Sequence, residues 1–209
     1  MLREIEIPDV DLDVKDRDHA LTALRNYVQA SQVNNDNALV GHNTGIYFQK
    51  VPVDPVSGLS AFPYKEAEFL GYFKVDLIPN HVYDLVASNE ELEELLDAPV
   101  NWDWFQDERF FEAEDKRYQL THLANYHHLC VMYPPKSVED VACLLALIRP
   151  GKRYLVAQPW EDVKREVWVK PEGDDYFFKK SHSVAFAVLV VLHAQLIARH
   201  LGEAEEYFI

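Results

Sequence analysis

The sequence has few basic residues for its length. Its 209 residues include 20 Lys and Arg against 35 Asp and Glu, which gives a formal net charge of −15. A protein that grips a phosphate backbone without help usually carries a basic face. Any role with nucleic acid therefore requires metal ions, a local basic patch or a partner protein.

Cysteine is also scarce, with Cys130 and Cys143 as the two examples. Both lie in apolar stretches, and their spacing fits neither a disulfide framework nor a metal site. This usage is typical of a reducing compartment, and no secretion signal is apparent. We therefore expect a cytoplasmic protein.

A long hydrophobic run is missing as well. The longest, residues 184–198, contains His193 and Gln195 and is shorter than the roughly 20 apolar residues that span a membrane. It predicts a buried helix that starts near an N-cap at Ser181 or Ser183. We expect no membrane association.

What is present indicates a globular α+β protein, since 48% of the residues are hydrophobic and only 7 are Gly. The first part, residues 1–86, reads as a small β-rich domain with helices, and residues 87–209 read as mostly helical. Apolar spacing predicts strands at 7–14, 44–51, 72–78 and 165–170 and helices at 15–32, 64–71, 88–98 and 137–148.

The stretch "IPDVDLDV", residues 7–14, places Asp9, Asp11 and Asp13 at alternate positions. In a strand these three carboxylates lie on one face, because successive side chains alternate. The simpler interpretation is an edge strand with a solvated face. The alternative is a divalent-metal site, because aligned carboxylates repel one another unless a cation lies between them.

A second acid, Asp76, lies among apolar residues in "YFKVDLI". Lys74 precedes it by two positions and shares its face of the strand. Asp76 is either a further metal ligand or a strand residue that accepts backbone hydrogen bonds. Lys74 either contacts a phosphate or pairs with the aspartates.

Taken in order, these and other segments resemble the palm and fingers of the bacterial DNA polymerase III alpha subunit, the C family of DNA polymerases. The segments are "IPDVDLDV" at 7–14, "GHNTGIYFQKVPVDP" at 41–55, "YKEAEFLGYFKVDL" at 64–77, "YPPKSVEDVACLLALIRPGK" at 133–152 and "YFFKKSHSVAFAVLVVLHAQLIARH" at 176–200.

The resemblance implies metal-dependent nucleotidyl transfer in DNA replication, with a nucleotidyltransferase-like palm sheet in residues 1–86 and a fingers-like region in residues 87–209. It implies two Mg2+ ions, with Mn2+ as the alternative, and primer-template DNA and a deoxynucleoside triphosphate as substrates. The implied catalytic and metal-binding acids are Asp9, Asp11 and Asp76, with Asp13 as a further metal ligand. The implied nucleotide contacts are Lys74, Tyr176, Lys180 and His182, and the implied phosphate or template contacts are His42, Arg149 and Lys179.

The chain departs from the family in ways that change the expected function. The family's preceding palm half, with its Gly-Ser nucleotide-binding loop, has no counterpart before Asp9. The roughly sixty residues between Asp13 and Asp76 are too few for the family's thumb.

Three interpretations of the function follow from these departures. The first is one piece of a split, compact polymerase of the kind a virus encodes, with a second polypeptide supplying the missing palm half. The second is an inactive remnant that binds a replication partner. The third is a phosphate-processing metalloenzyme on an unrelated α+β fold.

Overall fold

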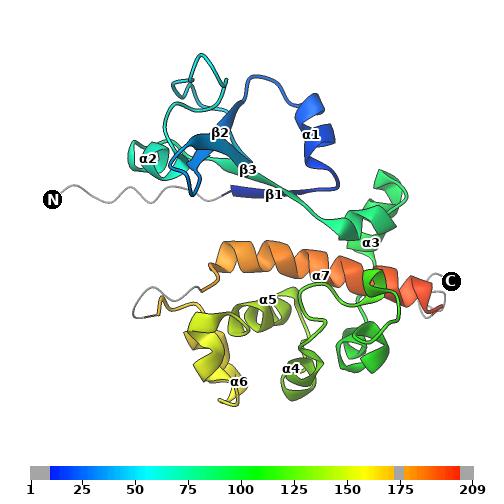
Figure 1. Cartoon of the computed structure of the whole chain (residues 1–209). Helices are drawn as coiled ribbons and strands as arrows, with labels where there is room; N and C mark the ends of the chain where they lie inside the picture. Colours follow the sequence, from blue (N-terminus) through cyan, green and yellow to red (C-terminus); the bar gives the residue numbers. More distant parts are fainter. Residues whose placement is uncertain (1–9, 172–176, 203–209) are drawn as a thin grey trace. The chain divides into compact units, whose positions relative to one another are not determined.

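The computed structural model describes residues 10–171 and 177–202, and it has one four-stranded mixed sheet and a larger set of helices (Figure 1). The α+β class predicted from the sequence is confirmed. The chain divides into two compact units, Met1–Asp84 and Leu85–Ile209. All four described strands belong to the first unit.

The sheet of the first unit has the strand order β1-β4-β3-β2. β1 (Val10–Val14) runs parallel to β4 (Val75–Pro79), which is antiparallel to β3 (Leu39–Tyr47). β3 in turn pairs antiparallel with β2 (Val28–Val33). This order places the first strand directly beside a strand from the far end of the unit.

Each face of the sheet has its own small core. Ile46 and Tyr47 are consecutive on β3, so their side chains lie on opposite faces. The Ile46 face packs against α1 (Arg17–Ala23), and the Tyr47 face packs against α2 (Tyr64–Phe69). α2 is the helix expected at 64–71, and Gly71 follows it with a positive φ of 92°.

The helix predicted for residues 15–32 was wrong in its second half. α1 ends at Ala23, Asn26 takes a left-handed φ of 58°, and β2 begins at Val28. Leu21 and Leu24 do pack into one core, as their helical spacing indicated. The strand forms because residues 28–33 pair with β3, a contact that local spacing does not encode.

The second unit is built from helices (Figure 1), and a large hydrophobic core lies among them. Both cysteines lie in this core as free thiols, and burial raises the pKa of Cys130 to about 12 and that of Cys143 to about 11. The helices are α3 (Asn89–Asp97), α4 (His127–Met132), α5 (Val138–Leu147), α6 (Trp160–Glu166) and α7 (Lys180–His200). The short 3-10 helices of the chain are η1 (His81–Leu85), η2 (Trp102–Gln106), η3 (Glu108–Phe110), η4 (Lys116–Tyr118) and η5 (Pro150–Leu155).

α7 contains the long apolar run and packs against α5. Its length and composition would suffice to cross a membrane, and 67% of the most apolar 18-residue stretch within His182–His200 is buried inside the protein. Its predicted cap was wrong, because the N-cap position is Lys179 and Ser183 lies within the first turn. The Ser183 hydroxyl donates instead to the carbonyl of Ala142 in α5, at 2.7 Å, which ties the two helices together.

The strand predicted at 165–170 is also absent from the described residues. Arg165 and Glu166 end α6, and a turn follows them. Salt bridges one helical turn apart support the helix, from Lys164 to Glu161 and from Arg165 to Asp162. The alternation of apolar residues in "REVWVK" therefore reflects the last turn of a helix and the loop after it.

Candidate functional site

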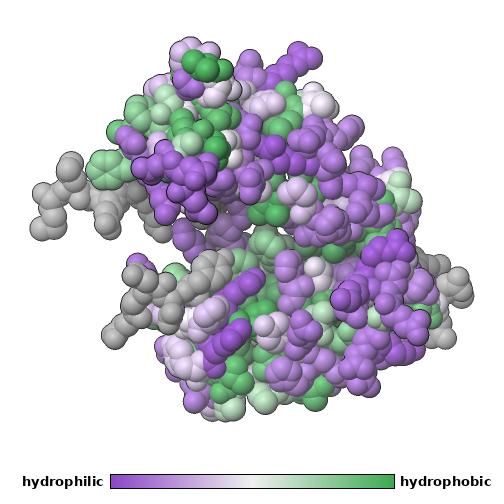
Figure 2. Space-filling model, in the orientation of Figure 1, coloured by the Kyte–Doolittle hydropathy of each residue, from purple (hydrophilic) through white to green (hydrophobic). Residues whose placement is uncertain are grey.

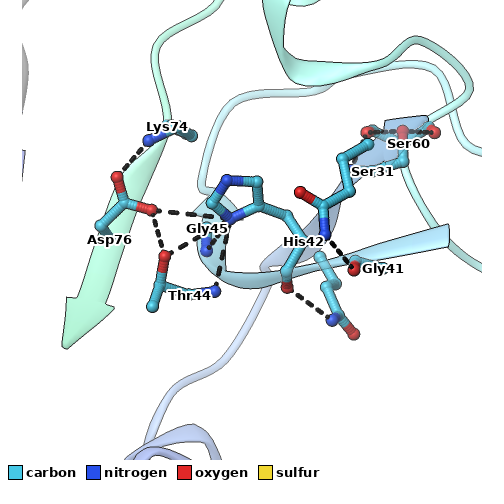
Figure 3. A network of polar contacts seen from close by, with 10 residues as sticks. Ser31, Gly41, His42, Thr44, Gly45, Ser60, Lys74 and Asp76 are labelled. Carbon is cyan, nitrogen blue, oxygen red and sulfur yellow. Dashed lines mark hydrogen bonds and ion pairs between the residues drawn. The ribbon is translucent and has the colours of Figure 1, made fainter. Parts of the chain in front are cut away.

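The candidate site is centred on the carboxylate of Asp76 in β4, and the residue is 8% exposed (Figure 3). Its Oδ1 accepts a hydrogen bond of 2.7 Å from the hydroxyl of Thr44, and its Oδ2 contacts the ammonium group of Lys74. Both partners are side chains. Asp76 is therefore not the acceptor of backbone hydrogen bonds that one sequence interpretation allowed.

Asp11 is the neighbour of Asp76 on the adjoining strand. The parallel register pairs the Cα atom of Asp11 with that of Asp76, so both side chains lie on the same sheet face. Neighbouring strands are about 4.8 Å apart, which brings two acidic side chains side by side. Two acids that lie far apart in the sequence are therefore neighbours on adjacent strands.

Asp13 lies on the same face, two residues further along β1. Partial burial raises the pKa of Asp13, and the negative charge of Asp11 raises it further. β1 is an edge strand among the described strands, as the simpler interpretation expected. Its acids are nevertheless partly buried, whereas Leu12, on the opposite face, is 47% exposed.

His42 lies against this group as a neutral imidazole. Its Nδ1 accepts the backbone N–H of Gly45 at 2.9 Å, so this nitrogen carries no proton. Burial lowers the pKa of His42, while the nearby charge of Asp76 opposes that shift. The distance of 3.8 Å from Nδ1 to Oδ1 of Asp76 is therefore a contact with a neutral ring and not an ion pair.

Tyr64, the first residue of α2, holds both His42 and Lys74 in place. The imidazole of His42 packs edge-on against the phenol ring, with ring centroids 5.0 Å apart. The ammonium of Lys74 lies 5.6 Å from the same ring centroid, within the range of a cation–π contact. Tyr64 therefore helps to keep the ammonium beside Asp76.

Sequence reasoning missed Thr44 and Tyr64 as members of this group. Thr44 lies inside the quoted motif "GHNTG", between His42 and Gly45, and Tyr64 opens the quoted segment "YKEAEFLG". Both residues therefore lie in segments that carry the resemblance to C-family polymerases. Nothing in their local spacing indicates a contact with a residue in another strand.

The remaining predicted residues lie in the second unit or outside the residues that the structure describes. Lys179 and Lys180 are exposed at the start of α7, and the Lys180 ammonium lies 5.9 Å from the ring of Trp168. The imidazole of His182, in the first turn of α7, lies 6.3 Å from the ring of Phe178. Asp9 and Tyr176 lie outside the described residues.

Arg149 belongs to the same part of the second unit. Its guanidinium lies 4.2 Å from the centroid of the Phe178 ring, a close cation–π contact. The neighbouring Lys152 is fully buried, and its ammonium donates to the carbonyl of Glu166 at 2.8 Å. Lys152 therefore serves the end of α6, which removes it from the residues that face solvent here.

The donors around Asp76 suit a hard cation such as Mg2+. Mg2+ prefers oxygen ligands and is often bound by one or two carboxylates together with water and substrate phosphates. Asp11 and Asp76 supply two such carboxylates side by side. Over residues 10–171 and 177–202 no group of three or more His, Cys, Asp or Glu side chains is arranged to hold a metal ion.

Comparison of the chain with protein-family models, with curated proteins and with solved structures finds no match.

Proposed function

We propose that the first unit carries the acidic part of a metal-dependent nucleotidyl-transfer site that acts in DNA synthesis. The observation that supports this most strongly is the pairing of Asp11 with Asp76 across two parallel strands, with Lys74 in contact with Asp76. Two adjacent carboxylates repel each other, and a bound cation is the simplest reason for a fold to place them together.

The residues of the site suit the electrostatic demands of phosphoryl transfer. Bound Mg2+ would neutralise phosphate charge and favour deprotonation of an attacking hydroxyl. Asp11 and Asp76 would hold such a cation, with Asp13 and Asp9 as further candidate ligands. Lys74, two residues before Asp76, would place a positive charge where the phosphates of a nucleotide approach.

The second unit offers the local basic patch that the overall charge lacks. Lys179 and Lys180 are exposed at the beginning of α7, where backbone N–H groups and the helix dipole favour anions. His182 and Arg149 lie nearby around Phe178. These positions are the ones that resemble the fingers signatures of C-family polymerases, and we propose them as contacts for the nucleotide and the template.

We further propose that this chemistry takes place in an assembly. A charge of −15 opposes unaided binding to DNA, and the roughly sixty residues between Asp13 and Asp76 are too few for the family's thumb. A second polypeptide would supply further residues that bind the DNA and the nucleotide. Primer-template DNA and a deoxynucleoside triphosphate would be the substrates.

One observation favours a second candidate function. The Lys74 ammonium contacts the Asp76 oxygen that a cation would otherwise bind, and this internal pair already balances the charge of Asp76. In an inactive remnant that binds a replication protein, Asp76 would need only its pairing with Lys74 and no cation. The two candidates differ in whether Asp76 is required for nucleotide incorporation.

Primer extension with Mg2+, in the presence of the proteins encoded by neighbouring genes, tests the proposal. We expect Asp76→Asn to abolish incorporation, because the amide keeps the shape and the Thr44 hydrogen bond but removes the charge that holds a cation. Asp36→Asn is the matched control, since Asp36 is exposed in the turn after β2. Equal incorporation by wild type and Asp76→Asn would refute the catalytic role.

A further inference from the structure

We propose that Thr44 is a positioning residue for Asp76, which fixes the orientation of its carboxylate for cation binding. This inference rests on the proposed nucleotidyl-transfer function, and it adds a residue that the sequence motifs did not indicate. Thr44 reaches Asp76 from the neighbouring strand β3, and Figure 3 shows its hydroxyl beside Oδ1.

The hydroxyl of Thr44 has two acceptors within reach, and the geometry selects one of them. It lies 2.7 Å from Oδ1 of Asp76 and 3.4 Å from Nδ1 of His42. Nδ1 has a single in-plane lone pair, which the Gly45 N–H already uses at 2.9 Å. The Thr44 proton is therefore donated to the carboxylate, and this charge-assisted bond is the stronger of the two.

This hydrogen bond determines which lone pairs of Asp76 remain for a cation. A carboxylate has about four lone-pair sites. Thr44 uses one on Oδ1, and Lys74 uses one on Oδ2, so each oxygen keeps one further site. With both oxygens held, the carboxylate keeps one orientation on the sheet face that it shares with Asp11.

Loss of the hydroxyl would free the carboxylate to rotate. The torsion that turns a carboxylate has broad minima, so once the Thr44 bond is gone the contact with Lys74 alone would set its orientation. The Lys74 ammonium could then approach both oxygens of Asp76 and compete more strongly with a divalent cation. Groups that orient metal ligands in this way typically contribute roughly tenfold or more to metal affinity.

Binding of Mn2+ alone to the full chain, measured by electron paramagnetic resonance and isothermal titration calorimetry, tests this role. We expect Thr44→Val, which keeps the branched shape, to weaken Mn2+ binding roughly tenfold, and Thr44→Ser, which keeps the hydroxyl, to bind within about twofold of wild type. A merely structural role of Thr44 would change the melting temperature and leave the Mn2+ affinity of the folded protein unaltered.

Comparing the variants with one another and with wild type separates the role of Thr44 from the existence of the metal site. If Asp76→Asn weakens Mn2+ binding and Thr44→Val does not, the positioning role is wrong while the metal site stands. If wild type binds Mn2+ no better than Asp76→Asn, the metal site itself is refuted, and the role of Thr44 with it. Thr44→Ala provides a second variant without the hydroxyl, and the affinity is taken from whichever variant melts at the wild-type temperature.

Discussion

Gly45 allows the side chains around Asp76 to approach one another. A Cβ atom at this position would lie 3.0 Å from Nδ1 of His42, 3.0 Å from Cδ of Lys74 and 3.1 Å from Cβ of Ala30. We expect Gly45→Ala to lower the free energy of unfolding by about 1–3 kcal/mol, because three neighbours must shift at once. Urea denaturation of the purified variant measures this loss.

Gly41→Ala, in the same strand, is the matched control. There the nearest atom is the terminal amide nitrogen of Gln29, at 2.7 Å, at the flexible end of a side chain. We expect a smaller loss than at Gly45. Equal losses at the two positions would show that the packing around Asp76 is not the reason for the glycine.

We expect His193 to make the second unit sensitive to acid. Its Nε2–H donates to the carbonyl of Arg117 at 2.8 Å, and its Nδ1 accepts the N–H of Thr121 at 2.9 Å. The imidazole is thus neutral, and burial lowers its pKa below the ordinary value of 6.5, with the backbone bond to Arg117 opposing the shift. Because the unfolded chain takes up a proton first, the stabilising contribution is complete above pH 6.5 and is lost as the pH falls below it.

Urea midpoints between pH 7.5 and pH 5 test this acid sensitivity. We expect wild type to lose stability across that range, by at most about 1.4 kcal/mol per pH unit from this one group. His193→Gln, which can still donate and accept, should show a shallower decline. His81→Gln, at a fully exposed side chain, is the control and should follow the wild-type curve.

At the level of residues, the sequence indicated the acids of the candidate site but not their supports. Asp11 and Asp76 could be named because alternation along a strand and a lone acid in an apolar stretch are local signals. The contact of Thr44 with Asp76 depends on the register between β3 and β4, which pairs Gly45 with Asp76. Such a register is set by the whole sheet, so a single sequence does not reveal it.

At the level of elements, the helices at 88–98 and 137–148 were predictable and the second strand was not. The Ser88 hydroxyl accepts the N–H of Glu91 at the start of α3, and Ser137 does the same for Asp140 at the start of α5. Those signals are local in sequence. β2 shares its residues with an apolar pattern that also fits a helix, and only its pairing with β3 decides between the two.

The cap of α5 gives a prediction for a whole element. The Ser137 hydroxyl accepts the Asp140 N–H at 3.1 Å, and every residue from Val141 to Leu147 in this helix is buried. We expect Ser137→Ala to lower the free energy of unfolding by about 1 kcal/mol, because the helix loses one of its terminal hydrogen bonds. Ser137→Asn keeps an acceptor at the cap and should retain most of the stability in the same urea titration. Equal losses in the two variants would contradict the capping role.

At the level of the whole molecule, the acidic net charge disfavours contact with phosphate, whereas the basic residues at the start of α7 favour it. Hydrophilic side chains cover most of the face shown in Figure 2, and the formal charge is −15. An acidic chain that handles nucleotides would have to confine its attraction for phosphate to a few positions, as at the start of α7. This distribution supports our proposal that the chain acts as a component of an assembly.

The division into two units predicts that the second one folds without the first. Its largest core runs from Trp104 to Ala198 and lies wholly within Leu85–Ile209, whereas both cores of the sheet lie within Met1–Asp84. We expect a fragment of residues 85–209 to give a helical circular dichroism spectrum and a single cooperative urea transition, because it retains every described residue of that core. The full chain, measured in parallel, is the control. A fragment that loses helical signal gradually, without a cooperative transition, would show that the helical core depends on the sheet.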